Sequence, residues 1–415
     1  METEQMWSEN LLSKKRIILG VSGGIAAYKS VELLRLLQKA GADVRVAMTE
    51  SAQKFVGRIT FEAISGYPVF ERMFDDAAGH EIRHINWAKD ADAVVIAPAT
   101  ANIIGKIACG IGDDALSTLM MAVTAPRVVC PAMNTNMFEN RAVQRNLDIL
   151  ERDGISVVAP GYGELACKTT GPGRLADPEE IAWRLVDVFT AKDLAGKRVV
   201  VSAGPTREPI DPVRYISNPS SGKMGYAVAQ AAALRGADVL LVSGPTVLAD
   251  PIGVRVRRIS TAQEMAEAVL DECGSADIVV KAAAVSDYRP AGVSAHKVKK
   301  EKDNLVLELE KTTDILAELG RRKTPGQILV GFAAETRDLE KYAIEKMKKK
   351  NLDMIAANLV GGKDAGFDAD TNLLRLFFPD GRSEKLSMMD KFTAAAIIMD
   401  RVATILARKG GIGQL

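Results

Sequence analysis

The sequence predicts an α/β protein with two Rossmann-like, doubly wound domains, because one pattern of elements occurs twice. In the first half, a buried strand at 17–24 runs through a glycine-bearing turn into a helical stretch at 25–40 and a second strand at 43–49. The second half repeats this order between 199 and 246, with a long insert before its helix at 226–235. Val/Ile-rich strands that alternate with helices indicate parallel sheets built from right-handed βαβ units.

Further elements complete both halves. Strands are expected at 91–99, 127–133 and 155–160 in the first half and at 254–260, 276–284 and 328–335 in the second. Residues 305–310 alternate as a strand does, and 373–387 as a hairpin. A helix at 176–194 followed by a polar junction places the domain boundary near residue 190.

Composition restricts the class of protein. A chain of 415 residues with 47% hydrophobic and 26% charged residues is typical of about two globular domains. The 54 basic residues nearly balance the 53 acidic ones, which argues against a binder of nucleic acid or of a membrane surface. No CxxC pair occurs among the four cysteines, so a structural zinc site is not expected. Without a secretory signal or an apolar run of about 20 residues, the interpretation is a reduced cytoplasmic protein.

The first candidate site begins at the turn that holds Ser22, Gly23 and Gly24. Small residues between a strand and a helix let backbone N–H groups face a phosphate, although a plain tight turn is the alternative. The GxGxxG fingerprint of dinucleotide binding is absent from this turn.

Polar side chains also follow two later strands. Pro98, Thr100 and Asn102 come after the strand at 91–99, at the edge where open α/β sheets bind ligands. After the next strand, Asn134 can pair with a carboxylate or an amide. Met133 and Met137 there are apolar walls or simple core filling.

Residues 14–190 resemble the homo-oligomeric flavin-containing cysteine decarboxylases, through SGGIAAYK, HINWAK, APATAN, PAMNTNMF and ACKTTGPGR in that order. They are most similar to the decarboxylase half of the bifunctional phosphopantothenoylcysteine decarboxylase/phosphopantothenate–cysteine ligase. The resemblance implies a flavodoxin-like domain over 1–190 that binds FMN at a subunit interface of a trimeric unit. It assigns FMN contacts to Ser22–Gly24 and to Pro98, Thr100 and Asn102.

The same resemblance implies roles for four side chains. His84 matches an essential histidine, Asn134 and Met137 match substrate-binding residues, and Cys167 matches the cysteine of a segment that covers the substrate. His80 lacks the motif around His84 and is expected in a solvated loop. Two further cysteines, Cys109 and Cys130, have apolar neighbours and are expected to be buried.

The chemistry accounts for these residue types. A carboxylate beside an ordinary thiol has no electron sink, whereas oxidation of the CH2–SH group by a flavin gives a thioaldehyde that accepts the electrons left by CO2. His84 would act as a base or orienter, and Asn134 would hold the carboxylate. Cys167 would protonate the enethiolate carbon.

The second candidate site is the loop that runs into the helix of the second half. Its SSGKMG (220–225) fails the Walker pattern, because Met224 follows Lys223 and Ser217 stands where glycine is needed. A different phosphate cradle, formed by Ser220, Ser221 and Gly222 at a helix N-terminus, remains open beside the alternative of an elaborate loop.

Residues 195–405 resemble the phosphopantothenate–cysteine ligase, through GPTREPIDPVRYISNPSSGKMG, AAAVSDYRP, HKVKK, GFAAET and KMKKKNLD. The resemblance implies a dimeric ligase domain over 191–415 that uses CTP and Mg2+. It assigns the acyl-nucleotide intermediate to Asn218 and the second half-reaction to Lys297. Nucleotide contacts are assigned to Ala282, Ala283, Asp287, Lys297, Thr312, Thr313, Asp314, Phe332, Lys346 and Lys350. Asp287 is expected to bind the ribose or the metal.

The two halves together predict an enzyme of coenzyme A biosynthesis that converts 4′-phosphopantothenate, cysteine and CTP into 4′-phosphopantetheine. Attack of the carboxylate on the α-phosphate of CTP would give an acyl-cytidylate, from which the cysteine amine displaces CMP. The implied assembly is a dodecamer, with trimeric decarboxylase units joined by dimeric ligase domains. Alternatives are a nicotinamide-dependent oxidoreductase, a flavin-binding regulator without activity and a prenyl-transferring flavin enzyme.

Overall fold

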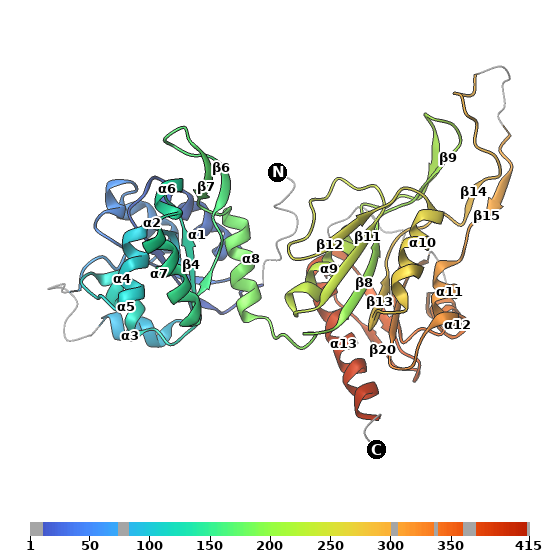
Figure 1. Cartoon of the computed structure of the whole chain (residues 1–415). Helices are drawn as coiled ribbons and strands as arrows, with labels where there is room; N and C mark the ends of the chain where they lie inside the picture. The colour runs from blue at the N-terminus through green and yellow to red at the C-terminus, as the bar shows by residue number, and fades with distance from the viewer. Residues whose placement is uncertain (1–10, 74–82, 300–305, 336–338, 360–370, 413–415) are drawn as a thin grey trace. The chain divides into compact units, whose positions relative to one another are not determined.

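The computed structural model describes residues 11–73, 83–299, 306–335, 339–359 and 371–412 (Figure 1). These residues form two compact units, of which one ends at Thr190 and the other begins at Ala191. Each unit is built around its own parallel sheet, as the alternation of strands and helices predicts.

The N-terminal unit has a five-stranded sheet in the order β2-β1-β3-β4-β5, and all its pairs are parallel. Its strands are β1 (Arg16–Val21), β2 (Asp43–Met48), β3 (Ala93–Ala99), β4 (Arg127–Pro131) and β5 (Ser156–Val157). This is the strand order of flavodoxin-like folds, in which the chain reverses its winding direction between the first and third strands. The predicted fold class is therefore confirmed.

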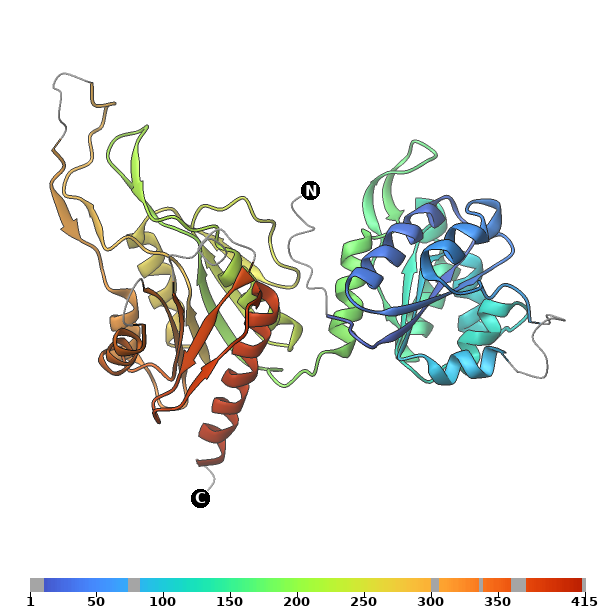
Figure 2. The same cartoon turned by 180° about the vertical axis from the view of Figure 1, so that it is seen from behind.

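Helices cover both faces of this sheet. The elements are η2 (Ile25–Tyr28), α1 (Lys29–Lys39), η3 (Ala52–Lys54), α2 (Arg58–Ser65), α3 (Arg83–Asp90), α4 (Ala101–Cys109), α5 (Ala115–Ala122), α6 (Thr135–Phe138), α7 (Arg141–Arg152) and α8 (Pro178–Phe189). Helices α1 and α8 pack together, while α4 packs on α7 and α3 on α5. A hairpin of β6 (Gly161–Glu164) and β7 (Thr170–Arg174) stands out from the unit (Figures 1 and 2).

The C-terminal unit has an eight-stranded sheet in the order β12-β11-β8-β13-β16-β17-β19-β20. The strands are β8 (Arg198–Ala203), β11 (Asp238–Ser243), β12 (Arg255–Arg258), β13 (Ile278–Lys281), β16 (Ile328–Glu335), β17 (Met354–Leu359), β19 (Leu374–Phe377) and β20 (Ser383–Lys385). All neighbours up to β17 are parallel, and β19 and β20 form the predicted antiparallel hairpin. The winding reverses between β8 and β13.

Two sets of helices cover this second sheet. They are α9 (Lys223–Leu234), α10 (Ala262–Cys273), α11 (Ile315–Arg322), α12 (Leu339–Lys349) and α13 (Lys391–Ile412). Helices α9 and α13 pack against each other, whereas α10, α11 and α12 contribute to one hydrophobic core with β13 and β16. Among the helices of the described residues, none is both long and apolar enough to cross a bilayer.

Some strands are shorter than predicted, because a segment forms a strand only where a neighbouring strand supplies backbone hydrogen bonds. The segment at 305–310 pairs only in β15 (Leu309–Lys311), whose partner β14 (Tyr288–Pro290) has three residues. The hairpin of β9 (Arg207–Pro209) and β10 (Tyr215–Ser217) and the pair of β18 (Thr371–Asn372) and β21 (Met389–Asp390) are too short to give a pattern.

Gly225 allows α9 to lie directly on β8, and we expect Gly225→Ala to destabilise the C-terminal unit. A Cβ atom at this position would lie 2.5 Å from the Cβ of Ala203. Such overpacking costs about 1–3 kcal/mol, so urea unfolding of the variant should begin at a lower concentration. Gly274→Ala is the matched control, because a Cβ there meets nothing within 4 Å. Equal unfolding midpoints for the two variants would contradict this packing.

Candidate active sites

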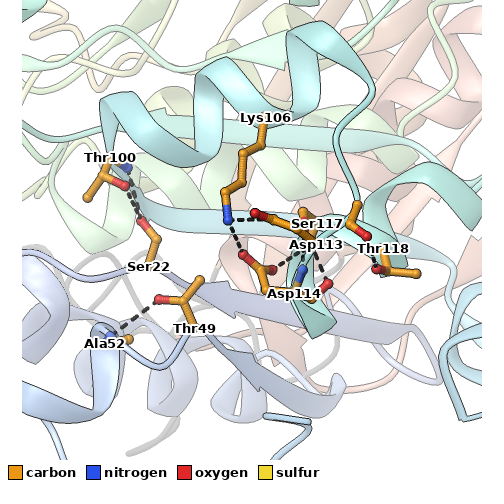
Figure 3. Close-up of polar contacts among 10 residues, drawn as sticks. Ser22, Thr49, Ala52, Thr100, Lys106, Asp113, Asp114, Ser117 and Thr118 are labelled. Atoms are coloured by element: carbon orange, nitrogen blue, oxygen red, sulfur yellow. Dashed lines mark hydrogen bonds and ion pairs between the residues drawn. The ribbon is translucent and has the colours of Figure 1, made fainter. Parts of the chain in front are cut away.

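The first site lies at the winding reversal of the N-terminal sheet, where the loops after β1 and β3 run side by side. Ser22, which is 1% exposed, donates its hydroxyl to the carbonyl of Pro98 at 2.8 Å. The same oxygen accepts the Thr100 N–H at 2.9 Å and lies 3.1 Å from the Thr100 hydroxyl (Figure 3). Both the side chain and the N–H of Ser22, which donates to the Pro98 carbonyl at 3.3 Å, are thus used to join the two loops.

Glycine permits the close approach of a third loop to this place. A Cβ atom on Gly23 would lie 2.3 Å from the Cβ of Ser51, which follows β2. Gly24 precedes η2 and has only Thr100 Cγ2 near its missing Cβ, at 3.5 Å. Asn102 is exposed in the first turn of α4, so its amide is free of the core. The edge therefore presents one exposed amide, that of Asn102.

An ion-pair cluster fixes the far end of α4. The Lys106 ammonium contacts Asp113 at 2.6 Å and Asp114 at 2.7 Å, and Asp114 caps α5 through the Ser117 N–H (Figure 3). Burial alone would raise the pKa of Asp114, but the hydrogen bonds from Lys106 and Ser117 lower it overall. The loop between α4 and α5 is held in place by this cluster.

Asn134 and Cys167, which are 33 residues apart in sequence, meet in the structure. The Asn134 Nδ2 group donates to the Cys167 Sγ atom at 3.0 Å. Asn134 also begins α6, and its Oδ1 atom accepts the Asn136 N–H at 2.9 Å. The helix cap therefore orients the amide so that its NH2 group faces the sulfur.

Thr169 is a third member of this group; it lies within ACKTTGPGR, but no role was predicted for it from the sequence. Its Oγ1 atom lies 3.1 Å from the Cys167 sulfur. Hydrogen bonds from Thr169, side chain and backbone, and from the Asn134 amide lower the pKa of the Cys167 thiol. A thiol of lowered pKa is the kind that exchanges a proton near neutral pH.

The β6–β7 hairpin carries Cys167 to Asn134 through two glycines. The carbonyl of Gly173 accepts the Met133 N–H at 2.9 Å. A Cβ on Gly173 would lie 2.2 Å from the Met133 carbonyl oxygen, and one on Gly171 would lie 2.5 Å from Thr135 Oγ1. These contacts require a backbone without side chains, which accounts for the glycines of the TTGPGR segment.

Other expected residues lie apart from this group. Met137 is 48% exposed on α6, as a wall residue for a ligand would be. His84 lies in the first turn of α3, and no hydrogen bond joins it to Cys167 or Asn134. Competing His80 lies outside the described residues. Cys130 is buried, as expected. Cys109, which was also expected to be buried, is exposed, because it ends α4 just before Gly110.

We expect Thr169→Val to raise the pKa of Cys167, because it removes the hydroxyl that favours the thiolate. The rate of alkylation by iodoacetamide follows the thiolate, so its half-maximal pH should move upward and the rate at neutral pH should fall severalfold. The measurement needs Cys109→Ser in every protein, since Cys109 is also exposed. Lys168→Gln is a suitable control in the same loop, and an unchanged pH profile for Thr169→Val would refute the assignment.

The second site is a cavity of about 440 Å³ at the winding reversal of the C-terminal sheet. Its lining includes Asn218, Ala282, Ala283, Asp287, Phe332 and Lys346, six of the residues that the sequence singled out. Ser220, Ser221 and Gly222 also line it, at the start of α9. Gly222 has a φ of +79°, where a side chain is disfavoured. The cavity thus opens onto a helix N-terminus, an arrangement suited to anions.

A second cavity of about 360 Å³ adjoins the first. It is lined by Thr312, Thr313, Asp314 and Lys350, and it shares Asp287, Phe332 and Lys346 with its neighbour. Lys350 contacts Asp314 at 2.8 Å. Burial alone would raise the pKa of Asp314, but the hydrogen bonds from Lys350 and the Ala317 N–H lower it overall.

Lys297 does not line either cavity. It is exposed in the segment after β14, next to Val298, whose N–H is bound by Asp211 and whose carbonyl is bound by Arg214. Asn218 donates its Nδ2 group to the Val285 carbonyl at 3.1 Å. Within the described residues there is no cluster of three or more acidic, histidine or cysteine side chains for a metal, so Asp287 is a single acid.

Several cavity residues were not identified from the sequence. Lys281, Asn358, Asn372 and Lys391 all line the first cavity. The only signal was at Lys281, a charged residue that ends an otherwise apolar strand. The others come from strands and a helix that meet only in the folded unit.

Comparison with known proteins matches both units. Residues 6–190 match the family model described as Flavoprotein, and residues 194–406 match that of the DNA/pantothenate metabolism flavoprotein C-terminal domain. The coenzyme A biosynthesis bifunctional protein CoaBC of Bacillus subtilis is 47% identical over 404 residues, which cover 96% of this chain and 99% of that protein.

Two solved structures are each similar to one part of the chain. The crystal structure of the C-terminal domain of a CoaBC protein is 43% identical, with a TM-score of 0.46, and covers 52% of this chain and 100% of its own. A PPC decarboxylase mutant complexed with pantothenoylaminoethenethiol is 32% identical, with a TM-score of 0.39. The match covers 41% of this chain and 96% of that chain. Because the match to the Bacillus protein spans nearly the full length of both chains, this chain belongs to the CoaBC family of bifunctional coenzyme A biosynthesis proteins.

Proposed function

We propose that the chain catalyses two consecutive steps of coenzyme A biosynthesis. Residues 191–415 join 4′-phosphopantothenate to cysteine with CTP, and residues 1–190 decarboxylate the product to 4′-phosphopantetheine. The observation that carries this proposal is the contact of Cys167 with Asn134, because it unites a thiol of lowered pKa with a carboxylate-binding amide. The full-length similarity to the Bacillus protein supports both steps.

The residues at the first sheet edge fit FMN. Gly24, which has little near its missing Cβ, lies beside the start of η2, where backbone N–H groups would suit a phosphate, and the exposed Asn102 would offer an amide. Thr100, positioned by Ser22, begins α4 on the other side. A bound flavin would supply the two-electron oxidation of the cysteine-derived CH2–SH group and its later reversal.

The chain's own residues would bind the substrate and move its protons. The Asn134 amide would hold the departing carboxylate by hydrogen bonds. It carries no full positive charge, and such a charge would stabilise the carboxylate too strongly. Cys167 would give its Sγ proton to the enethiolate carbon, and the β6–β7 hairpin would cover the site. Met137 would form an apolar wall, and His84 would act as a base or an orienter.

The C-terminal cavities would bind CTP and the acid that it activates. The start of α9 and the lysines Lys346 and Lys350 would hold phosphate groups, and Asp287 would bind the ribose or Mg2+. Asn218 would hold the acyl-cytidylate, and Lys297 would serve the displacement of CMP by the cysteine amine. Ala282, Ala283, Thr312, Thr313, Asp314 and Phe332 would complete the nucleotide contacts.

The assembly and location that the resemblance implies belong to the same proposal. They are FMN-binding trimers, ligase dimers, a dodecamer overall and a place in the cytoplasm. Mass analysis of products with and without CTP tests the function. We expect 4′-phosphopantetheine with CTP, and without CTP only after 4′-phosphopantothenoylcysteine is supplied. No product from either mixture would refute the proposal.

Substitutions should separate the two steps, because the sites belong to different compact units. We expect His84→Asn to reduce CO2 release at least about a hundredfold and to leave pyrophosphate release with CTP unchanged. Lys297→Gln should leave CO2 release from supplied 4′-phosphopantothenoylcysteine unchanged and reduce the formation of that adduct about a hundredfold. The two reactions are measured on each variant, and loss of both in either variant would contradict independent sites.

A further inference from the structure

The two cavities of the C-terminal unit meet at Lys281. This residue ends β13, next to β8, and its side chain lines both cavities. The first cavity contains the N-terminus of α9, and the second contains the pair of Asp314 and Lys350. Two reactants that occupy adjoining cavities can react only where the cavities join, so Lys281 lies at the place where bonds would be exchanged.

The charges around this junction are unequal. Lys350 is paired with Asp314, so its charge is partly compensated. Lys281 donates to the carbonyl of Ala283 at 2.8 Å. A carbonyl cancels no charge, and an ammonium group has three N–H donors. Among the described residues, Ala283 is the one hydrogen-bond acceptor that the structure gives Lys281.

We propose that Lys281 is a catalytic residue of the ligation reaction, whose ammonium group donates to a nonbridging oxygen of the CTP α-phosphate. This deepens the proposed function and rests on it. In the step concerned, a carboxylate oxygen of the acid forms a bond to the α-phosphorus. The bond from that phosphorus to the bridging oxygen breaks, and its electron pair leaves with pyrophosphate. Lys281 retains its proton and stabilises the negative charge that accumulates on the α-phosphoryl oxygens.

The surroundings of Lys281 give this role a signature in pH. Burial, then the nearby charges of Lys346 and Lys350, lower its pKa to about 8, against the opposing effect of Asp287 and Asp314. The ammonium form is therefore complete well below pH 8 and is lost as the pH rises through this value. An anionic triphosphate favours the charged form, so CTP binding near pH 8 should take up about half a proton.

The test compares Lys281→Gln and Lys281→Arg with the native chain. Lys385→Gln, an exposed lysine on β20, is the matched control. Pyrophosphate release is measured with saturating 4′-phosphopantothenate from pH 7 to pH 9 over a range of CTP concentrations, which gives kcat and kcat/KM for CTP at each pH. Proton uptake on CTP binding is measured at pH 8 by calorimetry in two buffers of different ionisation enthalpy. Thermal unfolding confirms that each variant is folded.

We expect Lys281→Gln to lower kcat at least about tenfold, with a smaller change in KM for CTP, and to abolish the proton uptake. Lys281→Arg should keep much of the native kcat at pH 7 and lose the decline of kcat/KM for CTP above pH 8, because arginine stays charged. Native rates in Lys281→Gln would overturn the proposal. If that variant is unfolded, an absence of proton uptake by the native chain at pH 8 would overturn it equally.

These outcomes are distinct from failure of the proposed function. If the native chain releases no pyrophosphate from CTP and 4′-phosphopantothenate, the ligase assignment itself is wrong. If the native chain and the Lys281→Gln variant release it equally, only the role of Lys281 is wrong.

Discussion

Both sites depend on one constraint of parallel sheets, which is that the carboxyl ends of neighbouring strands lie at the same edge. Where the winding direction reverses, the loops after two adjacent strands diverge and leave room for a ligand. In the N-terminal unit this happens between β1 and β3, and in the C-terminal unit between β8 and β13. The hydroxyl of Ser22 shows that the carboxyl ends of β1 and β3 are adjacent, because it joins the loops that follow these two strands.

Strand order alone does not bring Cys167 to its partners, because the hairpin that carries it lies outside the main sheet. Its position instead depends on the close contact of Gly171 and Gly173 with the loop that begins α6. That same loop uses Asn134 as a helix cap, which leaves the NH2 group directed at the sulfur. The cap of α6 thus sets which group of Asn134 faces the Cys167 thiol.

Periodicity was enough to predict the two sheets, since apolar strands and glycine-bearing turns are local signals. It could not predict Lys391, because that residue reaches the cavity only in the folded unit. Thr169 is a local neighbour of Cys167, but periodicity does not show that its hydroxyl faces the sulfur. Family motifs located Asn134, Cys167 and most of the cavity lining, and the structure groups these residues. For His84 and Lys297 the roles stay predictions, because neither residue contacts the site expected for it within one chain.

The two sites differ in charge as their proposed reactions require. Loss of CO2 destroys a carboxylate, so a cation bound to that carboxylate would stabilise the starting state and slow the reaction. In keeping with this, the side chains that contact Cys167 are the neutral ones of Asn134 and Thr169. Phosphoryl transfer accumulates negative charge, and Lys281 and Lys346 line the shared part of the two C-terminal cavities. Burial, and then the charges of Lys346 and Lys350, lower the pKa of Lys281. An anion that entered the shared part of the two cavities would favour the charged form of Lys281, as the proposed role of this residue requires.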